Sequence, residues 1–302
     1  MRASQLLLAG LIFGTLTLFG CQAVKIVSQI GTAVAVSQGA ISEDQAGSIN
    51  KSAEAVGKAF TDITPEQEYY IGRAVGASVV SNYRPFDRKR VNRYLNLLGQ
   101  SLARHSDLPE TFGGYHFLVL DSDEINAFAA PGGLIFVTRG LLRCCPDEDA
   151  VAAVLAHEIG HVQHRHGLQA IKKSRITSAL AIIGTESAKQ FGGADLARLT
   201  ETFENSIHDI TSTLINNGYS RQLEREADQG ALTILKRADY DPAALVTMLK
   251  EMDQRLEPGG SDFARTHPAP SDRIEEVASL VGTRTSVPRS RQQRFSEALA
   301  GI

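Results

Sequence analysis

The sequence predicts a mainly helical α+β domain that contains one small β-sheet. Long stretches of the chain carry apolar side chains at helical spacing, whereas only two short segments, 115–120 and 134–138, are apolar and rich in strand-forming residues. The chain has 302 residues, of which 43% are hydrophobic, so it is long enough to bury a substantial core. We therefore expect helices to form most of the core and the sheet to lie beside them.

The folded part is predicted to begin with a helix at Thr64. Thr64 can cap a helix, Pro65 suits the first helical position, and Gln67 completes a capping box. This helix should end near Tyr83, and a second one should follow over 87–104. Residues 22–60, rich in Ala, Gly, Ser and Val, predict a tether before this domain.

The two strand segments are expected to form a sheet next to a central helix. Pro131-Gly132-Gly133 stands just before the second strand and predicts a turn. The edge strand of such a sheet could pair with an extended peptide through main-chain hydrogen bonds. Further along the chain, Asp241-Pro242 predicts the start of a helix over 243–255.

The central motif is His157-Glu158-Ile159-Gly160-His161, within an apolar run that predicts a buried helix. Positions four apart lie on one helical face, so both imidazoles can bind one tetrahedral metal ion. Glu158 lies beside that ion, where it can take a proton from a metal-activated water. The alternative is a chance match, but a buried histidine and glutamate without partners would be costly.

A catalytic zinc usually has three protein ligands, so a third must come from elsewhere. The pattern that would supply another histidine soon after the motif fails, because His164 and Gly167 stand at its key positions. We interpret His164 and His166 as polar residues at the negative end of the helix.

Glu224 is the predicted third ligand, and Asp228 the predicted acceptor for the free ring N–H of a ligand histidine. These two residues are four apart and share a helical face. Small residues, among them Ala227, Gly230 and Gly160, should let the two helices approach closely. The alternative is a solvated charged helix, which we expect for Arg221, Arg225 and Glu226.

Together these motifs resemble the HtpX and CAAX prenyl-protease family of zinc metallopeptidases. The likeness is carried by the histidine motif, by the Glu224/Asp228 pair, by the segment 126–142, and by Thr266-His267-Pro268 with Arg273 behind it. It extends from about residue 64 to about residue 280. The layout is most similar to that of the small periplasmic lipoprotein members.

The resemblance implies a zincin-like, gluzincin fold, endopeptidase activity on proteins or peptides, and one Zn²⁺ per chain. It implies that 126–136 forms a cleft-lining strand, with substrate contacts at Asn126, Ala127 and Phe128. The alternative for Asn126 is a plain turn residue. His267 and Arg273 become candidate stabilisers of the oxyanion. His267 could instead occupy the fourth zinc position as a latch, or belong only to a turn.

The predicted reaction is metal-assisted peptide hydrolysis with Glu158 as general base. The alternative function is a periplasmic chaperone or assembly factor that uses the same cleft to hold clients. A purely structural zinc is less favoured, because such sites are usually closed by cysteine-rich ligand sets. A net charge of −3 and the lack of a basic, aromatic-rich stripe argue against nucleic-acid partners.

The N-terminus predicts a lipoprotein. Residues 1–20 are expected to be its signal peptide, with Arg2 before a short apolar stretch, and Leu18-Phe19-Gly20-Cys21 resembles a lipobox. The alternative is an ordinary signal peptide or an uncleaved anchor. Cys21 would then carry the lipid, and Gln22 favours the outer membrane, facing the periplasm. The expected organisation is a tether at 21–62, the metallopeptidase domain at 63–285 and a polar tail at 286–302.

Two further features of the sequence are a pair of adjacent cysteines and the segment 170–218. Cys144 and Cys145 are adjacent and are expected to be reduced and partly buried, with an intermolecular disulfide as the alternative. Residues 170–218 contain no apolar run long enough to span a bilayer, and we interpret this segment as a lid over the cleft. No internal repeat is present in the sequence.

Overall fold

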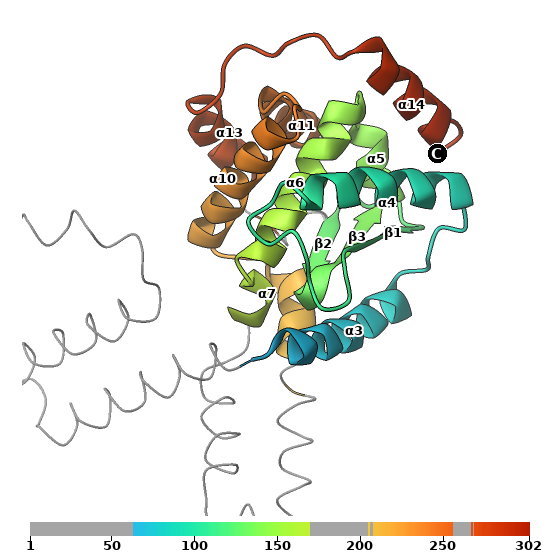
Figure 1. Ribbon diagram of the computed structural model, residues 1–302, viewed down its shortest axis with the longest axis vertical. Coiled ribbons are helices and arrows are strands. Elements are labelled where there is room, and N and C mark those ends of the chain that lie inside the picture. Colours follow the sequence, from blue (N-terminus) through green and yellow to red (C-terminus); the bar gives the residue numbers. More distant parts are fainter. Residues whose placement is uncertain (1–62, 170–204, 206–207, 256–266, 268) are drawn as a thin grey trace, which may run out of the picture. The chain divides into compact units, whose positions relative to one another are not determined.

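The computed structural model describes residues 63–169, 205, 208–255, 267 and 269–302 (Figure 1). The predicted signal peptide, Cys21 and tether lie outside the described residues, as does most of the predicted lid. The described part is mainly helical and contains a three-stranded sheet, which confirms the predicted fold class.

The sheet contains strands β1 (His116–Leu120), β2 (Ala127–Ala130) and β3 (Leu134–Thr138). β3 lies in the middle, parallel to β1 and antiparallel to β2. The turn η1 (Pro131–Gly133) reverses the chain, with φ values of 75° at Gly132 and 95° at Gly133, where glycine is favoured. Segment 126–136 therefore forms two strands and the turn between them, where we expected one strand.

The two faces of the sheet are covered by different helices. Helix α4 (Lys89–Ala103) and helix α6 (Glu148–Gln163) share a core with Phe117, Val119 and Ile135, which point to one face. Helix α3 (Pro65–Asn82) covers the other face, where the side chains of Leu134 and Phe136 lie close to Gly76. Both N-terminal helices thus match their predicted ranges to within two residues.

The outer edge of β1 is closed by two asparagines of α4. The Asn96 amide donates to the carbonyl of Phe117 and its oxygen accepts from the same residue's N–H, at 2.6 and 3.0 Å. The oxygen of Asn92 accepts from Val119 N at 2.9 Å. These side chains satisfy backbone groups of β1, whereas the other edge strand of the sheet, β2, lies next to α6.

Helix α6 is buried along almost its whole length, with every residue from Glu148 to Val162 inaccessible. Asp147 caps its N-terminus by accepting from Ala150 N at 3.0 Å. Helix α10 (Arg221–Arg237) packs along α6, and α11 (Ala243–Arg255) and α13 (Pro270–Ala278) pack beside them (Figure 1). The remaining short elements are α5 (Arg139–Cys144), α7 (His166–Gln169) and η3 (Thr213–Asn217).

The close approach of α6 and α10 depends on glycine. A Cβ atom added to Gly160 would lie 2.7 Å from the carbonyl oxygen of Ala227, nearer than real Cβ contacts come. Gly230 lies opposite, where an added Cβ would be 3.4 Å from the Cα of Gly160. The predicted role of these small residues is confirmed.

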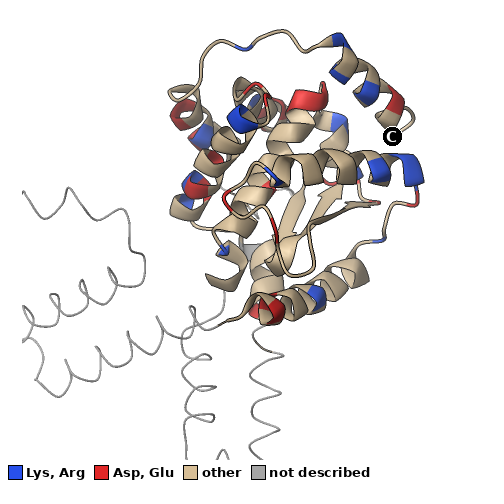
Figure 2. Ribbon diagram, in the orientation of Figure 1, with Lys and Arg blue, Asp and Glu red and all other residues tan. Residues whose placement is uncertain are grey.

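The polar segment after residue 287 forms helix α14 (Arg289–Leu299), which contacts α4 and α6 (Figures 1 and 2). Three arginines of this C-terminal region pair with the three acidic residues that open α6. The pairs are Arg284 with Asp147, Arg291 with Asp149, and Arg294 with Glu148. The tail thus holds the N-terminus of α6, a contact that its composition did not reveal.

Cys144 and Cys145 are both buried and carry thiols rather than a disulfide. Burial raises the pKa of the Cys145 thiol well above its usual range, which favours the protonated, unreactive form. An intermolecular disulfide is therefore disfavoured. None of the described helices combines the length and the apolar character that crossing a bilayer requires.

Candidate active site

Four buried side chains from three segments meet at one point beside α6. They are His157 and His161 of α6, Glu224 of α10, and His267. One ligand atom from each lies within 4.8 Å of all the others. The structure thus brings together the two histidines and the glutamate that the sequence singled out as ligands, and it places beside them His267, the candidate latch or oxyanion stabiliser.

The nitrogens that face the centre are the Nε2 atoms of both α6 histidines, which lie 3.1 Å apart. Each of them is 3.4 Å from an oxygen of Glu224. Imidazole nitrogens and carboxylate oxygens so close together concentrate electron pairs, which favours a cation between them. Histidine nitrogen and carboxylate oxygen are donors that zinc accepts.

Charge balance and an unsatisfied carboxylate point the same way. Three carboxylates, Glu158, Glu224 and Asp228, are buried near one guanidinium, Arg273. Although burial and Arg273 oppose it, Asp228 and Glu224 raise the pKa of His157 to about 9, and even with this ring charged one negative charge lacks compensation if all three carboxylates are ionised. A divalent cation would supply that compensation. Neither oxygen of buried Glu158 accepts a hydrogen bond from the described residues. A carboxylate in this state needs a water or a proton, so the residues fit a metal that carries water.

Burial also adjusts the protonation of these groups. Burial raises the pKa of Glu158, and His267 only partly offsets that effect. For Glu224, burial opposes ionisation, but His267 and Arg273 outweigh it and hold the pKa well below its usual range. Burial lowers the pKa of His161, so this ring is neutral and able to bind a metal. One carboxylate is thus suited to proton transfer and the other to ligation.

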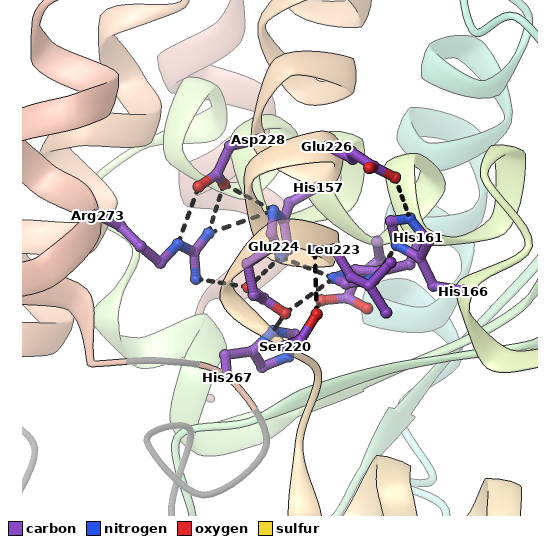
Figure 3. Close-up of polar contacts among 11 residues, drawn as sticks. His157, His161, His166, Ser220, Leu223, Glu224, Glu226, Asp228, His267 and Arg273 are labelled. Atoms are coloured by element: carbon purple, nitrogen blue, oxygen red, sulfur yellow. Dashed lines mark hydrogen bonds and ion pairs between the residues drawn. The ribbon is translucent and has the colours of Figure 1, made fainter. Parts of the chain in front are cut away.

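Asp228 lies where the sequence predicts it, 2.9 Å from Nδ1 of His157 (Figure 3). Arg273 is directed at the same carboxylate, with Nε 3.0 Å from one oxygen and Nη2 2.5 Å from the other. Burial opposes the charge on Asp228, yet Arg273 and His157 bring its pKa down to about 2. The remaining nitrogen of Arg273 lies 3.2 Å from Glu224, so the guanidinium joins two carboxylates of α10.

His267 lies inside the cluster and not at its rim. Its Nδ1 is 2.8 Å from Glu224, its Nε2 is 3.9 Å from Glu158, and its side chain is 3% exposed. This ring therefore stands beside both the expected third ligand and the expected base.

His166 was expected to be a polar residue at the helix end, and it belongs to the site instead. Glu226 is 38% exposed, in line with the solvated face expected for it, but it also pairs with His166. The side chain of His166 is fully buried, with its Nδ1 2.9 Å from Nδ1 of His161 and its Nε2 3.2 Å from Glu226 (Figure 3). Spacing alone did not reveal them, because His166 follows a reversal of the chain at Arg165, where φ is 54°. Arg221 and Arg225 do form exposed ion pairs, as expected.

Tyr219 is a second residue that the sequence did not single out. Its ring stacks on that of His161, with centroids 4.3 Å apart and planes 20° from parallel. Burial, aided by Glu158 and Glu224, raises the pKa of this phenol well above its usual range. Its hydroxyl is buried and makes no hydrogen bond to the described residues, so a neutral donor is held next to the cluster.

The predicted substrate-contacting residues lie on and before β2. Asn126 is buried, its N–H and its carbonyl both bond to Thr138, and its side-chain oxygen accepts from the N–H of Ala127 at 2.9 Å. Ala127 packs in the core with α6, and the ring of Phe128 lies 5.5 Å from that of Tyr83. The side chains thus fix the strand, and any contact with a peptide would fall to its backbone.

Comparisons with known proteins match this chain to metallopeptidases. Residues 89–281 match the sequence profile of peptidase family M48. The beta-barrel assembly-enhancing protease of Escherichia coli K12 is 30% identical over 216 residues, covering 70% of this chain and 42% of that protein. The mitochondrial metalloendopeptidase OMA1 of Schizosaccharomyces pombe is 34% identical over 158 residues, covering 50% of this chain and 42% of that protein. The chain thus spans less than half the length of these relatives.

Proposed function

Because the chain belongs to peptidase family M48 and carries its metallopeptidase domain, we propose that it is a zinc-dependent endopeptidase of the bacterial envelope. The observation that carries this proposal is the buried cluster of His157, His161 and Glu224 with the unsatisfied carboxylate of Glu158 beside it. From the address predicted by the N-terminal sequence, and from relatives named as beta-barrel assembly-enhancing proteases, its proposed substrates are misfolded envelope proteins.

In the proposed site, His157, His161 and Glu224 hold one Zn²⁺. When bound, zinc supplies a water of lowered pKa, about 7 instead of about 15.7, and a Lewis acid for the scissile carbonyl. Glu158 takes the proton of the attacking water and returns one to the leaving amine. The raised pKa of this carboxyl suits both transfers.

The supporting residues have separate proposed roles. Asp228 accepts the Nδ1–H of His157 and so fixes that ring's tautomer, and Arg273 orients Asp228 and Glu224. With Arg273 occupied by two carboxylates, Tyr219 and His267 are the better candidates to donate a hydrogen bond to the oxyanion.

His267 is proposed to act first as a latch. One of its ring nitrogens is among the clustered ligand atoms, so the ring can occupy the position that a substrate must enter. The contact with Glu224 at 2.8 Å supports this role over that of a turn residue. A peptide that displaces the ring would then open the site.

The outer edge of β2, beginning at Ala127 and Phe128, is proposed to bind an extended peptide as an added strand. Asn126 would position this edge, because its own N–H and carbonyl both bond to Thr138 of β3. β2 is the edge of the sheet nearest α6, and the opposite edge is closed by asparagines. Main-chain pairing would be independent of substrate sequence, as a protease of misfolded proteins needs.

The cellular location is proposed from the N-terminal sequence. Removal of residues 1–20 and acylation of Cys21 would anchor the domain to the outer membrane, facing the periplasm, through the tether 21–62. Metabolic labelling with a palmitate analogue should mark the wild-type chain and not Cys21→Ala. Equal labelling of the two proteins would overturn the anchor.

The decisive test of the enzyme compares wild type with Glu158→Gln for cleavage of unfolded casein, with zinc content measured on both. We expect equal zinc and a loss of cleavage of at least about 100-fold, because general-base catalysis contributes about 10²–10⁴-fold. Glu251→Gln, which alters a glutamate paired with Arg255 on α11, is the control and should cleave normally. Equal cleavage by wild type and Glu158→Gln would refute the mechanism.

A holding function without proteolysis is the alternative, suggested by the assembly-enhancing relatives. It predicts zinc in wild type, no cleavage by either protein, and client binding that survives in Glu158→Gln.

A further inference from the structure

The two histidines of α6 have different partners at the nitrogen that faces away from the cluster. Nδ1 of His157 lies 2.9 Å from the carboxylate of Asp228. Nδ1 of His161 lies 2.9 Å from another imidazole nitrogen, Nδ1 of His166. The outer partner of His161 is thus a ring that could be either donor or acceptor.

The geometry around His166 determines whether its Nδ1 is a donor or an acceptor. In the proposed site, His161 directs its Nε2 to the metal, so its proton is on Nδ1 and must be donated. His166 Nδ1 must therefore be an acceptor, which requires the proton of that ring to be on Nε2. Nε2 faces the carboxylate of Glu226 at 3.2 Å, and a carboxylate accepts such a proton. In this series of hydrogen bonds, Nδ1–H of His161 and Nε2–H of His166 each meet one acceptor (Figure 3).

We propose that His166 and Glu226 are positioning residues for the metal, forming a relay in which the carboxylate sets the tautomer of His166 and His166 orients His161. This inference rests on the proposed function, since it assigns new residues to the same metal site. It gives each ligand histidine a carboxylate, directly for His157 and through one imidazole for His161.

The backbone conformation favours a defined relay through His166 over an incidental contact between His166 and His161. Arg165 has a φ of 54°, an unfavourable conformation for a residue with a side chain, and it directs His166 back towards α6. The Nε atom of Arg165 lies 3.2 Å from the buried carboxylate of Glu68, which helps hold this turn. The ring of His166 is itself fully buried against His161, with centroids 5.0 Å apart.

Three substitutions separate the steps of the relay. His166→Leu removes the acceptor for His161, and we expect the dissociation constant for Zn²⁺ to rise about 10- to 100-fold, as for other residues behind metal ligands. His166→Asn retains an oxygen near the position of Nδ1, so it should restore most of the affinity. Glu226→Ala leaves His166 without its carboxylate and should give an intermediate loss.

A matched control is available on the same helix. Gln222 donates to the other oxygen of Glu226 at 3.1 Å and is exposed, so Gln222→Ala disturbs Glu226 without breaking the relay. Its zinc affinity should match that of wild type. Circular dichroism and thermal unfolding of the metal-free proteins would show whether any variant has simply lost its fold.

The test is a competition titration of each metal-free full chain with Zn²⁺, together with long-range ¹H–¹⁵N spectra of the histidine rings in the zinc-bound proteins. We expect the ordered loss of affinity, and His166 protonated on Nε2 in wild type. If wild type binds zinc tightly while His166→Leu, still folded, binds it equally well, the relay is wrong and the proposed function stands. If wild type itself binds no zinc, the proposed function fails.

Discussion

Gly160→Ala tests whether the distance between α6 and α10 sets the metal site. The new Cβ would lie 2.7 Å from the carbonyl oxygen of Ala227, and ordinary contact begins at 3.4 Å. The helices must therefore separate by about 0.7 Å along that line, the difference of the two distances. Metal–ligand distances tolerate only about ±0.2 Å, and Glu224 lies one turn before Ala227, so Glu224 should withdraw from the histidines.

The expected stability change is the balance of two effects. Overpacking against backbone costs about 1–3 kcal/mol, whereas replacing a helical glycine by alanine gains about 1 kcal/mol. The metal-free variant should thus lose roughly 0–2 kcal/mol in free energy of unfolding, by these same magnitudes. Zinc affinity should fall by about 10-fold or more, equivalent to about 1.4 kcal/mol, because the displaced ligand is one of three.

Gly230→Ala is the matched control, since it puts the same methyl into the same interface from the other helix. Its Cβ would meet the end of the Gln163 side chain at 2.7 Å, which can rotate away, and the Cα of Gly160 at 3.4 Å. Urea unfolding of the metal-free proteins and competition titration with zinc measure both quantities. If Gly160→Ala retained wild-type affinity, or if both variants lost it equally, the spacing argument would be refuted.

Two predictions concern other buried groups. If His267 is a latch, His267→Ala should retain zinc and cleave casein faster than wild type, whereas slower cleavage at equal zinc content would assign the ring to the oxyanion. Burial raises the pKa of Glu68 above its value of 4.5 in the unfolded chain, an effect that Arg165 only partly offsets. The protonated carboxyl therefore stabilises the fold at low pH, and that stabilisation is lost as pH rises through the folded pKa. As the pH rises above about 4, Glu68→Gln should consequently gain free energy of unfolding relative to wild type, measured by urea unfolding of the metal-free proteins. A gain that shrinks as the pH rises would contradict the sign.

The residues of the cluster that could be predicted were those related by helical spacing. His157 with His161, and Glu224 with Asp228, are each four apart, so local geometry alone places each pair on one face. Their meeting could be anticipated because the small residues between the helices allow close packing. The fold class followed in the same way from periodicity, which is a local property.

The parts that could not be predicted depend on contacts between distant segments. His166 resembled a solvated helix end, because nothing in the sequence shows the reversal at Arg165 that returns it to His161. Glu226 is a partly exposed charge, as expected, but its contact with His166 could not be predicted for the same reason. Tyr219 belongs to the site because its ring stacks on that of His161, and no periodic pattern in the sequence predicts this contact.

The start of α6 shows how a buried charge can be misread from its sequence. Acidic residues in a first turn suit the helix dipole, which is sufficient explanation for an exposed helix. In this fold Glu148 is fully buried, so the dipole cannot replace the lost hydration, and direct partners are needed. Arg294 of α14 and the hydroxyls of Tyr94 and Tyr240 provide them. A C-terminal segment that looked like a polar tail is thus required by a helix that precedes it by more than a hundred residues, because that helix must be buried to present its histidines.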